Sequence, residues 1–261
     1  FSPTAGAPAA MAVNSVTAAA AFLVSAYWLR ARLPERPKQV VIKGRQWLWS
    51  SIPMAAADAM RTVQPQLVIL ILASATDPSQ VGLFRIAVSI LTALSAPAVL
   101  INAVVFPLLS TLHAEKDDHR LQVLVTRSAQ AQFAATLILS APLLVAGRPL
   151  LTSIFGAEYG PAALPVAILL VGMIINTAFG PNTPLLNATH HEGRVTRAMM
   201  AAIVLTVVST PVLGWLYGAV GAAIAVFIGQ LGWNVLASID AKKLLGINTS
   251  SFGNWRTARS A

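Results

Sequence analysis

Long apolar runs separated by short basic clusters constrain this chain more than any other feature of its sequence. Each run has about 20 residues or more, which is the length an α-helix needs to cross the hydrocarbon of a bilayer. Hydrophobic residues make up 56% of the 261 positions and charged residues only 10%. A water-soluble protein of this length would lack the polar side chains to cover its surface. The sequence therefore predicts an all-α, multi-pass membrane protein.

The apolar pattern predicts about seven transmembrane helices. Prolines fall within or near the ends of several runs, where membrane helices tolerate them as kinks. Cysteine is absent from the sequence, which excludes disulfides and thiolate chemistry. The expected spans are residues 7–29, 47–74, 81–107, 121–147, 161–187, 195–215 and 218–243.

The distribution of positive charge predicts the orientation of these helices. Lys and Arg number 18 against 9 Asp and Glu, an excess that by itself fits either nucleic acid or a membrane surface. All basic residues except Arg61, Arg85 and Arg148 lie in the connections and tail that the seven spans place on one side, or within the adjoining ends of the spans. The positive-inside bias makes that side the cytoplasm. We therefore expect a start outside, a cytoplasmic end and no nucleic-acid partner.

Several short motifs follow one another in a recognisable order along the chain. They are Ser51–Pro53, Val81–Phe84 with Ala87, Pro107–Ser110, Leu151–Tyr159 with Ala162 and Ala163, Ile168–Gly172, Pro184–Asn187 and Tyr217–Ala223. In this order they resemble the polysaccharide flippases of the multidrug/oligosaccharidyl-lipid/polysaccharide exporter superfamily. The resemblance extends from about Gln46 to Gly246 and implies that the seven helices correspond to helices six to twelve of a twelve- to fourteen-helix, two-lobe transporter fold.

This resemblance implies a domain organisation. Residues 1–29 are expected to form the last helix of an N-terminal lobe, and residues 30–46 a basic cytoplasmic linker between lobes. Residues 47–243 are expected to form a six-helix C-terminal lobe, and residues 244–261 a cytoplasmic tail. Because the chain begins at Phe1 rather than Met, we expect a longer protein, whose N-terminal lobe is then a partner of the lobe seen here.

The resemblance also implies a function. Flippases of this kind move a polyprenyl-diphosphate-linked oligosaccharide across the bacterial inner (plasma) membrane by alternating access, for lipopolysaccharide or exopolysaccharide biosynthesis. Family members often carry an acid near the outer end of the helix that opens the second lobe, where this chain has Gln66. Its acid is Asp58, earlier in that helix, so a coupling role for the acid does not transfer directly.

Asp58 and Arg61 are predicted near the middle of the bilayer, three residues apart and hence on one helix face. Ionisable groups at that depth are costly unless they are paired or face water. Two interpretations stay open. The pair lines a cavity in which Arg61 engages an anionic group such as a lipid diphosphate, or it neutralises itself and fixes helix packing.

Arg85 and Asn102 are further candidates for contact with substrate. Arg85 is expected close to the outer end of its helix, where its long side chain reaches the headgroups, or else binds phosphate through its forked guanidinium. Asn102, like Gln64, Gln66 and Gln132, is polar at membrane depth. Interhelical hydrogen bonding is the simplest explanation for such amides.

Competing functions differ in the side chains that they need. A multidrug or cation exporter of the same superfamily favours carboxylates over arginines within the membrane, the reverse of this chain. A retinal protein needs a lysine near mid-membrane in its last helix, whereas Lys242 and Lys243 lie at its inner end. A membrane enzyme of glycan assembly gathers acids, His or metal ligands at one face. We expect a transporter, with no catalytic residue, metal or cofactor.

Overall fold

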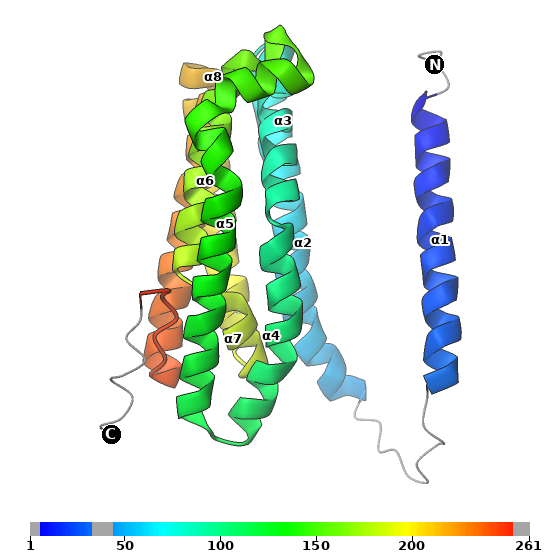
Figure 1. The fold of residues 1–261 in the computed structure, drawn as a ribbon, viewed down its shortest axis with the longest axis vertical. Helices are drawn as coiled ribbons and strands as arrows, with labels where there is room; N and C mark the ends of the chain where they lie inside the picture. Colours follow the sequence, from blue (N-terminus) through cyan, green and yellow to red (C-terminus); the bar gives the residue numbers. More distant parts are fainter. Residues whose placement is uncertain (1–5, 33–43, 253–261) are drawn as a thin grey trace. The chain divides into compact units, whose positions relative to one another are not determined.

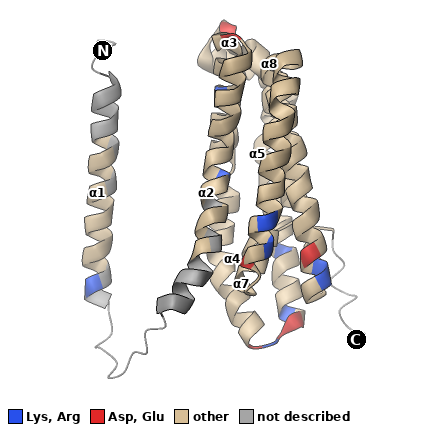
Figure 2. Ribbon diagram, turned by 180° about the vertical axis from the view of Figure 1, so that it is seen from behind, with Lys and Arg blue, Asp and Glu red and all other residues tan. Residues whose placement is uncertain are grey.

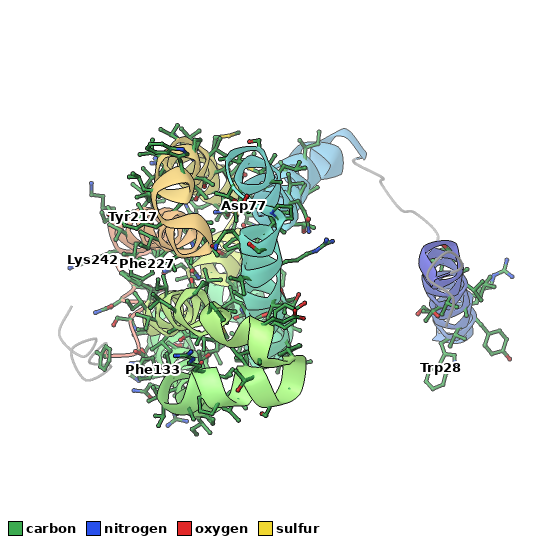
Figure 3. The ribbon with its side chains drawn as sticks, turned by 90° about the horizontal axis from the view of Figure 1, so that it is seen from above. Trp28, Asp77, Phe133, Tyr217, Phe227 and Lys242 are labelled. Atoms are coloured by element: carbon green, nitrogen blue, oxygen red, sulfur yellow. The ribbon has the colours of Figure 1, made fainter. Side chains whose placement is uncertain are left out.

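The computed structural model describes residues 6–32 and 44–252, and the chain divides into two units, Phe1–Gly44 and Arg45–Ala261. In the first unit, α1 (Gly6–Arg32) is one helix. Its large apolar side chains are exposed, including Phe22 and Trp28, which projects away from the helix axis (Figure 3). An apolar helix with such a surface is suited to lipid rather than water. Most of the predicted linker 30–46 lies outside the described residues, and its role stays a prediction.

The second unit is a bundle of helices joined by short turns (Figure 1). Its described residues contain no strand, which confirms the predicted all-α class. The helices are α2 (Gly44–Ala75), α3 (Pro78–Leu94), α4 (Ala96–Ala114), α5 (Asp118–Phe155), the short 3₁₀ helix η1 (Ala157–Ala162), α6 (Ala163–Ala178), α7 (Asn182–Ala188) and α8 (Glu192–Leu245).

Several predicted helices are bent or broken in the structure. The span expected at 81–107 continues through Ser95 as α3 and α4, with Pro97 just after the joint. The backbone of α5 leaves the helical region at Ala146, three residues before Pro149. The span expected at 161–187 is interrupted between α6 and α7, where Gly180 has a φ of 77°.

The longest helix, α8, is a hairpin of two helices that turn back at Gly218, as the boundary between the predicted spans 195–215 and 218–243 indicates. Gly218 has a φ of 58° and a ψ of −132°, a conformation that glycine adopts readily. Gln80 completes the turn, because its side-chain oxygen accepts a hydrogen bond of 3.0 Å from the backbone N–H of Ala219.

Four helical segments in the described part of the chain are long and apolar enough to cross a membrane, while Ser15–Trp28 and Pro78–Leu94 are shorter apolar helices. The four are Ala96–Ala114, Asp118–Phe155, Ala157–Ala178 and the α8 hairpin. The total of seven spans stays a prediction. Large apolar side chains such as Leu100, Ile138 and Val208 are exposed on these helices, as lipid contact requires.

Two buried clusters hold the second unit together. One joins Val68 and Leu72 of α2 to Phe84 and Ala87 of α3, and extends to α6 and α8. The other joins α4, α5, α7 and α8 around Leu109, Leu121, Val125, Leu185 and Leu186. Lys and Arg gather mostly toward the end at which α4 meets α5 (Figure 2). We call this the basic end; its residues are Lys116, Arg120, Arg127, Arg194, Arg197, Lys242 and Lys243.

The two arms of α8 pack closely at Gly229. A Cβ atom added there would overlap the Thr206 hydroxyl and lie 2.8 Å from the carbonyl oxygen of Ala202. Gly229→Ala in the full-length protein should therefore destabilise the fold by about 1–3 kcal/mol, the usual cost of overpacking. Thermal unfolding of the purified protein in detergent measures this loss.

Gly232→Ala is the matched control, three residues further along the same arm. Its added Cβ would meet only the Leu205 side chain at 3.5 Å, an ordinary contact, and alanine favours a helix by about 1 kcal/mol over glycine. Equal melting temperatures for the two variants would contradict the close packing at Gly229.

Candidate functional site

Arg61 lies near the middle of α2. It is 14 residues before the end of that helix at Ala75, or about 21 Å at 1.5 Å per residue. Its side chain is exposed, as are those of Thr62 and Val63 beside it. Asp58 lies three residues earlier on α2, but its side chain is outside the described ones, so the predicted pairing of Asp58 with Arg61 stays a prediction.

Arg85 lies further into its helix than the sequence indicates. The expected start at residue 81 places it close to the outer end, whereas α3 begins at Pro78. Seven residues correspond to about 10 Å along the helix axis, so Arg85 lies about two turns from the start of α3. The Arg85 side chain is exposed, while Phe84 and Ala87 on the same helix are buried.

The exposed side of α3 also carries hydroxyl groups that the sequence analysis missed. Ser89 and Thr92 are exposed and lie four and seven residues after Arg85, so the three share one face of the helix. The Ser89 hydroxyl donates to the carbonyl oxygen of Arg85 at 2.9 Å, and the Thr92 hydroxyl donates to that of Val88 at 2.8 Å. Their oxygen lone pairs remain able to accept hydrogen bonds. The spacing of Arg85, Ser89 and Thr92 in the sequence could have predicted this shared face.

The other two candidates differ in their surroundings. Gln66 is exposed on α2, five residues after Arg61. Asn102 on α4 is half-buried, and its side-chain oxygen accepts a hydrogen bond of 2.9 Å from the Gln132 amide of α5. The helices of Arg61, Gln66 and Arg85 are consecutive, and both α2 and α3 contribute residues to one buried cluster.

Amide side chains at membrane depth tie helices together, as expected for Gln64 and Gln132. Gln64 of α2 donates to the Thr206 hydroxyl of α8 at 3.0 Å, and Gln132 donates to Asn102. Asn234 instead donates to the Gln230 carbonyl within α8 at 2.8 Å. Among the residues that the structure describes, no three His, Cys, Asp or Glu side chains are grouped to hold a metal ion.

Comparison with known proteins places the chain in a family. Residues 5–164 match the model of the polysaccharide biosynthesis protein family, so the chain belongs to that family. No curated protein sequence matches the chain.

Solved structures of transporters share the fold of this chain. They include a MATE protein in a bent conformation, with a TM-score of 0.60 and 19% identity over 79% of this chain and 48% of that one. A multidrug resistance MATE family transporter of the MOP superfamily, in an outward-facing conformation, has a TM-score of 0.58 and 18% identity over 78% and 46%.

A third structure is a MOP superfamily transporter from Pyrococcus furiosus Vc1 (DSM3638), whose binding pocket has a reversed polarity that suggests a different function. Its TM-score is 0.59, with 18% identity over 81% of this chain and 47% of that one. The chain therefore spans about half the length of these transporters. It is a multi-pass membrane protein with part of the MOP-superfamily fold.

The Asn102–Gln132 hydrogen bond joins α4 to α5, and its coupling energy is measurable. Asn102→Ala, Gln132→Ala and the double variant form a double-mutant cycle. Hydrogen bonds between membrane helices contribute about 0.6 kcal/mol on average and up to about 1.7 kcal/mol, so we expect a coupling in that range from unfolding of the full-length protein. Strictly additive effects would show that the contact does not stabilise the fold.

Proposed function

We propose that the protein to which this chain belongs flips a polyprenyl-diphosphate-linked oligosaccharide across the bacterial inner membrane by alternating access. The observation that carries the proposal is the pair of exposed arginines, Arg61 and Arg85, on the consecutive helices α2 and α3, which the sequence predicts to cross the membrane. Membership of the polysaccharide biosynthesis protein family supports a glycan substrate. The fold shared with MOP-superfamily transporters supports transport rather than catalysis.

The energetic argument concerns the cost of an arginine in a membrane. Charged side chains at the bilayer centre are unfavourable by several kcal/mol, and those that occur usually face a water-filled cavity or bind a counter-charge. Arg61 and Arg85 lie at depths of about 21 Å and 10 Å below neighbouring helix ends. Two guanidiniums at different depths suit a diphosphate that moves along the pathway, because each binds phosphate oxygens with a fixed fork of donors.

We assign roles to the remaining candidate residues from their hydrogen-bonding groups and charge. Ser89 and Thr92 share the face of Arg85 and offer acceptor oxygens to sugar hydroxyls. Gln66 offers an amide on the helix of Arg61, and Asp58 is assigned to balance the charge of Arg61 when the substrate leaves. Asn102 positions α4 against α5 through its hydrogen bond with Gln132. We assign it mainly to shaping the site, with contact to the glycan as a secondary role.

A multidrug exporter is the second candidate. The MATE structures support it through the fold, and a cationic drug would need acidic partners at depth. Away from the ends of α2 and α3, the charged side chains that the structure describes are those of Arg61 and Arg85 instead. A parallel exists in the transporter from Pyrococcus furiosus, whose reversed pocket polarity suggests a function different from its relatives.

Arg61→Ala in the full-length protein should impair export of the surface glycan by about ten-fold or more, since a hydrogen bond to a charged group contributes about 1.5–3 kcal/mol. Complementation of a flippase-deficient strain measures surface glycan together with the lipid-linked intermediate that accumulates inside. Arg120→Ala is the matched control, because Arg120 is exposed at the basic end and pairs with Asp117 at 3.2 Å. Normal export by the Arg61→Ala protein, with membrane insertion verified, would refute the assignment.

Arg85→Lys separates the two roles that Arg85 can have. Lysine reaches the headgroups as well as arginine does, but it does not reproduce the two-pronged contact with phosphate. We expect Arg85→Lys to insert normally and to lose most of the export activity, and we expect the same loss for Arg85→Leu. Full activity of the lysine variant in the same complementation assay would assign Arg85 to anchoring at the membrane surface.

A further inference from the structure

The segment Gly246–Phe252, which we call the strap, folds back onto the bundle after α8 ends. Gly246 makes the turn with a left-handed φ of 67°. Ile247, Thr249 and Ser251 are then buried, with exposed fractions of 4%, 2% and 5%. Alternate residues of the strap therefore face the protein, although the sequence predicted a cytoplasmic tail from residue 244.

Two glutamines of α5 hold the backbone of the strap. Gln122 forms a double contact with Asn248, in which its amide donates to the Asn248 carbonyl at 2.7 Å and its oxygen accepts from the Asn248 N–H at 2.9 Å. Gln130 donates to the carbonyl of Ser251 at 3.2 Å. The rings of Phe133 and Phe252 pack edge to face, with centroids 5.7 Å apart; Figure 3 labels Phe133 on α5.

The strap also contacts the interruption between α6 and α7. The backbone N–H of Ser251 donates to the carbonyl of Ala178, the last residue of α6, at 2.9 Å. A Cβ atom on Gly180 would overlap the carbonyl oxygen of Thr249 and lie 3.0 Å from the Cβ of Ala129 on α5. Strap, interruption and α5 thus meet at a point with no room for another side chain.

This junction explains how the chain tolerates a broken helix. Breaking the α6–α7 helix at Gly180–Pro181 frees a backbone carbonyl, and in a membrane such a group needs a donor from the protein. Ser251 of the strap supplies that donor. Both polar side-chain atoms of Asn182, the first residue of α7, are buried without a hydrogen-bond partner in the protein, so an opening that admits water would solvate them.

We propose that the strap is a latch that holds the α6–α7 interruption closed at the basic end, and that its release lets α7 move against α5. The closed state is stabilised by the two glutamines and by the Ser251–Ala178 hydrogen bond. The open state gains hydration of Asn182. Such movement is required for an alternating-access cycle, and that part of the inference rests on the proposed function.

Hydrogen–deuterium exchange of the full-length protein tests the latch without any substrate. In the Gln122→Ala/Gln130→Ala variant, amides of residues 179–188 and 246–252 should exchange at least ten-fold faster, while those of α3 stay unchanged. Arg127→Ala is the matched control, because Arg127 is exposed on α5 between the two glutamines. Faster exchange in the strap alone, or an equal increase that includes α3, would overturn the proposal.

A disulfide that locks the strap in place tests the opposite effect, which is loss of the open state. The hydroxyl oxygens of Ser238 on α8 and Thr249 are 3.4 Å apart, and the chain contains no cysteine of its own. Oxidised Ser238→Cys/Thr249→Cys should show slower exchange at residues 179–188 and at least a ten-fold loss of glycan export, both reversed by reductant. Each single variant serves as control.

The two measurements, hydrogen–deuterium exchange and glycan export, distinguish failure of the latch from failure of the flippase assignment. If oxidation slows exchange but no variant or parent protein exports glycan, the latch stands and the substrate assignment fails. If the oxidised protein exchanges and exports as the reduced protein does, the latch is refuted.

Discussion

Every backbone N–H and C=O in hydrocarbon must find its partner within the protein, and the shape of this bundle depends on how that requirement is met. An unbroken helix meets it without help. At two of the places where the chain leaves the helix, another element supplies the missing partner. Gln80 accepts from the N–H of Ala219 at the turn of α8, and the strap donates to the carbonyl of Ala178 where α6 ends. Irregular backbone is therefore confined to places where a side chain or segment can reach it.

The same requirement separates two kinds of polar residue in the second unit. Gln64, Gln122 and Gln132 are engaged in hydrogen bonds that join helices or hold the strap, so their polarity is used for structure. Arg61 and Arg85 are charged and have exposed side chains on α2 and α3, helices that the sequence predicts to cross the membrane. Since an exposed guanidinium in lipid is costly, the faces that carry them are the ones to which a polar cavity or an anionic substrate is assigned.

Much of the fold was predictable because the signals are local. Length and hydropathy indicate membrane helices, and the hairpin at Gly218 falls where two runs meet at a glycine. Pro181 beside Gly180 signalled a kink, but a kink and a full interruption have the same local sequence. The strap packs against the interruption, and its partner Gln122 is 126 residues from Asn248. No periodic pattern reports a contact of that kind, so residues 244–261 read only as a polar tail.

The candidate site shows the same division between local and distant information. Helical spacing places Arg85, Ser89 and Thr92 on one face, and that grouping could have been found from the sequence. The depth of Arg85 could not, because it depends on where α3 begins, and the boundary at Pro78 lies three residues before the expected start. Those three residues correspond to about 4.5 Å, a large part of the length of an arginine side chain. The distance of Arg85 from the start of its helix is therefore set by a proline at that start, a feature of backbone geometry rather than of charge.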